Sequence, residues 1–178
     1  DEEITDGVIK KTKRRFNWLL LNLVTAIVAS VVIGFFKEDI EKVVALAVLM
    51  PIVASMGGNA GMQTLAVTVR TIATNDLTQN NFSSNVFKEF SIGILNGIIF
   101  AAISAFIVHI WFQDSILSIV IAISMILTMI IAGLFGILVP FTLKKMNIDP
   151  AIASSVFVTT ITDVIGFVSF LGVGAYFL

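Results

Sequence analysis

Cysteine is absent from the 178 residues, and charged residues are scarce. Without cysteine the chain has no disulfide, no thiolate metal site and no cysteine nucleophile. Charged side chains make up 13% of the chain, against about 25% in a typical soluble domain, while apolar residues reach 57%. The net charge of −1 leaves no basic surplus for binding nucleic acid. This composition predicts a chain whose solvent is mostly lipid.

Five long apolar stretches predict an all-α integral membrane protein with five transmembrane helices. A bilayer core of about 30 Å needs about 20 mostly apolar helical residues. Backbone groups in lipid must also be satisfied within the protein, which favours helices. The predicted spans are Asn17–Phe36, Val43–Val69, Phe90–Phe112, Ile116–Leu143 and Ala151–Leu178. The first is too long for a usual signal-peptide core, which disfavours the alternative of a cleaved leader.

The basic residues lie mainly on one side of a chain that crosses five times. Nine of the eleven fall in the N-terminal segment, at the edges of the loop after the second span, or in the loop after the fourth. By the positive-inside rule that side is cytoplasmic, so the N-terminus is predicted to be inside and the C-terminus extracytoplasmic. Residues 1–16 then form a cytoplasmic segment, expected to be the truncated connection to a soluble domain. Residues 17–178 form the membrane domain.

Asp163 is the one acidic residue predicted to lie deep in the membrane. It follows Ala151 by twelve residues, which places it about 18 Å along a helix. An ionisable group at that depth marks a functional site by default. No basic residue is predicted within a span, so the carboxyl group needs a proton, a water-filled cavity or a bound cation. The alternative is a protonated Asp163 that bonds a neighbouring helix.

The neighbours of Asp163 at helical spacing are polar or small. Ser155, Thr159 and Gly166 share its face, and Thr162 lies beside it. Such a stripe is suited to line a wet path. Asp149, before Pro150 at the start of the fifth span, is expected to be a helix cap.

The second span contains the other unusual stretch, from Pro51 through Gly57, Gly58, Asn59 and Gly61. Proline and glycine favour irregular backbone, and broken membrane helices can present free carbonyls to cations. The alternative is close packing, because Gly57 and Gly61 form a small-xxx-small pair. No nucleophile–base pair, phosphate loop or zinc-type cluster is present in the sequence, so an enzyme is not expected.

Three stretches resemble the MgtE magnesium transporter family. The first contains Arg14-Arg15-Phe16-Asn17-Trp18. The second is Pro51-Ile52-Val53-Ala54-Ser55-Met56-Gly57-Gly58-Asn59-Ala60-Gly61-Met62-Gln63. The third contains Asp149-Pro150-Ala151-Ile152-Ala153, followed by Thr159–Gly166. The resemblance implies a plasma-membrane homodimer with a Mg²⁺ pathway between subunits, lined by the second and fifth helices. It also implies that Asp163 is the central ion-binding carboxylate. Met62 departs from the family pattern, where asparagine is common.

We therefore expect a Mg²⁺ channel that recognises a largely hydrated ion. Asp163, Thr159, Ser155, Asn59 and Gly58 are the predicted metal-site residues, and Mg²⁺ is the transported ion. The expected partners are membrane lipid, the divalent cation and a second copy of the chain. Two alternatives remain open: a secondary transporter coupled to H⁺ or Na⁺, and a membrane scaffold that transports nothing.

Overall fold

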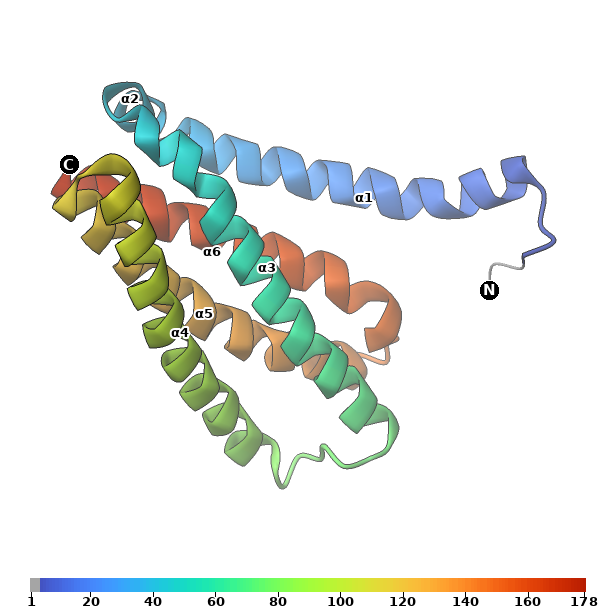
Figure 1. Cartoon of the computed structure of the whole chain (residues 1–178). Coiled ribbons are helices and arrows are strands. Elements are labelled where there is room, and N and C mark those ends of the chain that lie inside the picture. Colours follow the sequence, from blue (N-terminus) through green and yellow to red (C-terminus); the bar gives the residue numbers. More distant parts are fainter. Residues whose placement is uncertain (1–3) are drawn as a thin grey trace.

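The computed structural model describes residues 4–178, and over that range its secondary structure consists of six helices joined by short connections (Figure 1). Five of them are long and apolar enough to cross a bilayer. The predicted all-α fold with five candidate spans is therefore confirmed. The helices are α1 (Val8–Gly34), α2 (Lys37–Lys42), α3 (Val44–Ala73), α4 (Phe82–Phe112), α5 (Ser115–Lys145) and α6 (Pro150–Phe177).

Two helices begin well before their predicted spans, and one short helix was not predicted. α1 starts at Val8 and α4 at Phe82, so part of the expected polar loop before residue 90 is helical. Lysine and arginine are good helix formers, so α1 continues beyond the apolar stretch. The unexpected helix is α2, whose first turn carries Glu38 and Asp39 and whose last turn carries Lys42, as the helix dipole favours.

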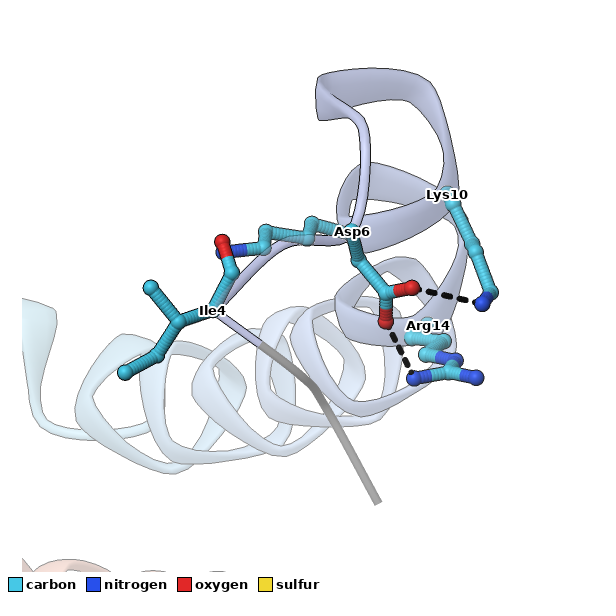
Figure 2. A network of polar contacts seen from close by, with 5 residues as sticks. Ile4, Asp6, Lys10 and Arg14 are labelled. Atoms are coloured by element: carbon cyan, nitrogen blue, oxygen red, sulfur yellow. Dashed lines mark hydrogen bonds and ion pairs between the residues drawn. The ribbon is translucent and has the colours of Figure 1, made fainter.

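Asp6 fastens the residues before α1 to the first turns of that helix (Figure 2). Its carboxylate accepts from Nζ of Lys10 at 2.5 Å and from Nη1 of Arg14 at 2.8 Å. The segment therefore joins α1 directly, and the helix runs unbroken past residue 16. The role of residues 1–16 as a cytoplasmic connection stays a prediction. Asp1, Glu2 and Glu3, the expected cut end, lie outside the described residues.

α5 lies at the centre of the bundle, packed against α3, α4 and α6, whereas α1 touches mainly α6 (Figure 1). Fifteen residues of α5 are buried, but Ala29 is the only buried residue of α1. Large apolar side chains of α1, such as Leu19, Leu23 and Ile27, are exposed. The first helix thus presents most of its apolar surface to lipid or to another chain.

Glycines allow α4 and α5 to approach each other closely. A Cβ added at Gly93 would lie 2.8 Å from Cα of Ile130, and one at Gly97 would lie 3.0 Å from Cα of Ile126. Both obstacles are backbone atoms, which cannot rotate away. Gly93 and Gly97 therefore serve helix packing.

The start of α6 is defined by its cap. Oδ1 of Asp149 accepts from the backbone N–H of Ala151 at 2.9 Å, and Pro150 occupies the first helical position. Proline suits that position because its missing N–H would have no partner there. The predicted capping role of Asp149 is confirmed, and this carboxylate is not a member of the site described below.

Replacing Gly93 by Ala should destabilise the bundle by about 1–3 kcal/mol, because the added methyl group forces the α4 and α5 backbones apart. The matched control is Gly172→Ala, where the nearest side-chain atom to an added Cβ is 4.0 Å away. That change should leave stability unchanged or raise it, since alanine favours helices over glycine. Thermal unfolding of the purified protein in detergent measures both. Equal stability of the two variants would contradict the packing described here.

Candidate functional site

Two glycines on α3 form its contact with α6. A Cβ added at Gly57 would lie 3.7 Å from Cβ of Thr162, and one at Gly61 would lie 2.9 Å from Cγ1 of Val158. The same Cβ at Gly57 would also lie 2.5 Å from Cγ2 of Thr128 on α5. These two positions are therefore packing glycines, as the small-xxx-small alternative predicted. They also fix which faces of α3 and α6 meet.

The residues that follow these contacts turn to one common side. Successive residues of a helix lie about 100° apart. We call the line of contact between α3 and α6 the seam. Because the two helices run in opposite directions (Figure 1), the residue after each contact position lies on the same side of the seam in both helices. On α3 these are Gly58 and Met62, and on α6 they are Thr159 and Asp163.

That side of the seam is open in the subunit. Nothing lies within 4 Å of a Cβ added at Gly58, Asn59 and Thr159 are exposed, and Asp163 and Ser155 are partly exposed. We call these five residues the open face. All five predicted metal-site residues therefore lie away from the packed core. Asn59 lies a further 100° round α3 from Gly58, so it is farther from the seam than the others.

Asp163 has no polar partner within residues 4–178. Its carboxylate forms no hydrogen bond and no ion pair with any described residue. A charged group at membrane depth is costly unless it is paired or reaches water or a cation. The dry, capped contact that would make Asp163 a simple helix-packing group is not what this subunit shows. Its carboxylate is available to a ligand on the open face.

The hydroxyl and amide groups of the open face are arranged as acceptors. Oγ1 of Thr159 donates to the backbone carbonyl of Ser155 at 2.7 Å, so its remaining lone pairs face outward. Nδ2 of Asn59 donates to Oγ of Ser55 at 3.4 Å, which leaves the amide oxygen to accept. With the carboxylate of Asp163, these oxygens form a surface that favours donors, such as the waters around a cation.

Gly166, a member of the predicted polar stripe, and Thr162, predicted beside it, do not lie on the open face. Thr162 is fully buried, and a Cβ at Gly166 would lie 3.7 Å from side-chain atoms of Val53 and Thr128. Both residues therefore pack α6 against its neighbours. The prediction that Gly166 shares the face of Asp163 was wrong. Three residues of a helix turn by about 300°, so Gly166 lies about 60° from Asp163, on the side of the seam.

The expected break in the second span is also absent. α3 is one continuous helix, with Pro51 inside it. Proline removes one donor, which leaves the carbonyl of residue 47 without its usual helical partner. The carbonyls of Gly58 and Asn59 lie inside regular helix instead. Gly58 contributes close access to the backbone, since it has no side chain.

Sequence reasoning missed a second carboxylate within a long helix. Glu89 appeared to be at a span edge, but it is the eighth residue of α4 and is partly buried. Its spacing to Gly93 and Gly97, at i+4 and i+8, puts it on the packing face, and that pattern would have found it. The described residues contain no group of three or more histidines, cysteines, aspartates or glutamates that could hold a metal ion.

Comparison with known proteins identifies the family. The family described as MgtE, divalent cation transporter, matches residues 50–173. The chain belongs to the MgtE family. This segment includes the α3 glycines and the whole open face, and it confirms the resemblance seen in the sequence.

Three relatives carry the name magnesium transporter MgtE. Those of Bacillus subtilis and Thermus thermophilus are 34% and 32% identical, over 93% and 92% of this chain. That of Enterococcus faecalis is 28% identical over 99%. The matches cover 37%, 36% and 39% of the three relatives, so the chain spans little more than a third of their length. With five candidate spans, this MgtE chain is a multi-pass cell-membrane protein of a transporter family, not an enzyme.

A single cysteine should distinguish the open face from the packed seam, because the chain has no other cysteine. A membrane-impermeant thiol reagent should modify Thr159→Cys, and Mg²⁺ should slow the reaction. It should leave Thr162→Cys unmodified, since that position is fully buried. Mass spectrometry of the purified protein in detergent quantifies both reactions. Faster labelling at position 162 than at 159 would reverse the assignment of the two faces.

Proposed function

We propose that this chain forms a Mg²⁺-conducting channel in which Asp163 recognises a largely hydrated ion at a homodimer interface. The observation that carries the proposal is the unpartnered carboxylate of Asp163 on an open face of acceptors. The relatives are named magnesium transporters, and their family is described as transporting divalent cations. The chemistry of that task is oxygen ligation of a small divalent ion.

Recognition through water follows from the properties of Mg²⁺. The ion demands six oxygen ligands in octahedral geometry and gives up water reluctantly. One subunit offers one membrane-embedded carboxylate on this face, too few ligands to replace the whole hydration shell. Thr159, Ser155 and Asn59 instead accept hydrogen bonds from the coordinated waters. Gly58 leaves room for those waters beside α3.

A second copy of the chain completes the site in this proposal. The open face needs a cover, because acceptors at membrane depth cannot face hydrocarbon. Two copies that meet at this face bring two Asp163 carboxylates towards one axis, where a divalent cation relieves their repulsion. The exposed apolar surface of α1 supports association as well, since Leu19, Leu23 and Ile27 have no cover in the subunit.

The proposed orientation places the N-terminus in the cytoplasm. Residues 4–16, the α3–α4 loop and the α5–α6 loop then share the cytoplasmic side, where nine of eleven basic residues gather. Ions would cross between this side and the extracytoplasmic side, which carries α2. Residues 1–16 would connect the membrane domain to a soluble domain, in keeping with relatives that are much longer than this chain.

Replacing Asp163 by Ala should lower Mg²⁺ flux into proteoliposomes by at least about tenfold. A hydrogen bond to a charged group contributes about 1.5–3 kcal/mol, and the variant loses such bonds to the hydrated ion. The control is Asp149→Asn, which removes one carboxylate at the helix end while asparagine still caps. It should conduct normally. Near-normal flux in the Asp163 variant would end the proposal.

The same proteoliposomes separate the alternatives. A channel passes Mg²⁺ current set by its gradient and the voltage, with no dependence on a second ion. Flux that requires an opposing H⁺ or Na⁺ gradient would identify a coupled carrier instead. A scaffold would show no flux in the unaltered chain. Repeating the assay with Mn²⁺, Co²⁺ and Ca²⁺ measures selectivity.

A further inference from the structure

Glu89 makes one polar side-chain contact within residues 4–178, and it joins two helices. Its Oε2 accepts from Oγ1 of Thr64 at 3.1 Å, linking α4 to α3. Both residues are partly buried. Glu89 and Asp163 are the two carboxylates within the five long helices of the described residues, and of these two only Asp163 has no partner. A hydrogen bond to a charged acceptor is worth more than one between neutral groups of the same geometry, and at 3.1 Å this one is longer than most O–H···O bonds.

The position of Glu89 is set by the glycines of α4 and α5. Gly93, one turn further along α4, presses that helix against the α5 backbone. A Cβ at Gly133 of α5 would lie 3.0 Å from the backbone oxygen of Glu89 and 3.9 Å from its Oε2. The carboxylate therefore lies beside Gly133 of α5, where no side chain intervenes, and its Oε2 reaches Thr64 of α3.

Thr64 is held from the other side by a second glycine of α5. A Cβ at Gly136 would lie 2.6 Å from Cβ and 2.9 Å from Cγ2 of Thr64. It would also lie 3.0 Å from the backbone oxygen of Gly61, one turn earlier on α3. The threonine is thus enclosed between the α5 backbone and the Glu89 carboxylate. Any rotation of α3 about its axis must break the hydrogen bond or collide with α5.

The rotation of α3 matters because one helix carries both the contact and the open face. Gly61, held against Gly136, also meets Val158 and Thr162 of α6, at 2.9 and 3.3 Å from an added Cβ. The next residue, Met62, turns to the side of Asp163. We propose that Glu89 is a positioning residue, whose hydrogen bond with Thr64 fixes the rotation of α3 that places its open-face residues opposite Asp163. The expected effect on Mg²⁺ flux rests on the proposed function, whereas the contact between Glu89 and Thr64 does not.

The test uses four single variants of the full chain in proteoliposomes. Glu89→Ala and Thr64→Val remove the hydrogen bond, and valine keeps the shape of threonine. Both should raise the Mg²⁺ concentration for half-maximal flux by about fivefold, as expected for the loss of one hydrogen bond. Glu89→Gln and Thr64→Ser keep an acceptor and a donor, so both should stay near the unaltered chain. Thr64→Val tests the inference even where Glu89→Ala fails to fold.

A cysteine at position 62 distinguishes positioning from a purely structural role of Glu89. Met62→Cys, in the cysteine-free chain, follows the rotation of α3 directly. Its modification rate by a membrane-impermeant thiol reagent, measured per folded molecule, should change severalfold with Glu89→Ala or Thr64→Val. It should stay constant with Glu89→Gln. If Glu89 merely added stability, replacing it would lower the yield of folded protein. The labelling rate and the half-maximal Mg²⁺ concentration would then stay unchanged.

Two results would overturn the inference. If Glu89→Gln is as impaired as Glu89→Ala, the negative charge itself is required and positioning through Thr64 is wrong. If Glu89→Ala and Thr64→Val match the unaltered chain in both readouts, the hydrogen bond positions nothing. Failure of the proposed function looks different, because Asp163→Ala would then conduct normally. The reporter at position 62 would still measure the rotation of α3 in that case.

Discussion

The close approach of helices at glycine is the constraint on which this structure depends. Gly57 and Gly61 on α3, and Gly133 and Gly136 on α5, stand where any side chain would meet a neighbouring atom within about 3 Å. Lipid tails are as apolar as leucine, so burial of apolar groups gives helices little reason to associate in a membrane. Shape therefore decides the arrangement. Once the glycines have set which faces meet, the faces that stay open are determined as well.

The open face follows from this packing through the regular geometry of the two helices. Helix geometry carries the residue after each packed position to one side of the α3–α6 seam, and there the sequence places Gly58, Thr159 and Asp163. The local hydrogen bond of Thr159 turns its hydroxyl into an outward acceptor. A surface of acceptors attracts a hydrated cation and offers little to an anion. The same glycine contacts thus account for the close packing of the helices and for which side of the seam stays open.

The sequence predicts the helices well and their faces only partly. Span length and apolar content identify all five long helices, because lipid permits few alternatives. The start of α4 at Phe82 was missed, since serine and asparagine there resemble a loop. At the site, the depth of Asp163 follows from counting residues, but the burial of Thr162 and Gly166 depends on which helix lies opposite. The glycines at 57 and 61 suggested a broken helix first and close packing as the alternative, and the neighbouring atoms of Thr128 and Val158 decide for packing.

The contact between α1 and α6 has a consequence for biosynthesis. These are the first and the last of the six helices, yet α1 finds its main neighbour in the subunit only in α6. A growing chain inserts α1 long before α6 leaves the ribosome, so the first helix must wait in the bilayer by itself. Its apolar surface on nearly every side equips it for that interval. Assembly of this bundle is therefore completed only after α6 has entered the bilayer, and without α6 the first helix loses its main neighbour.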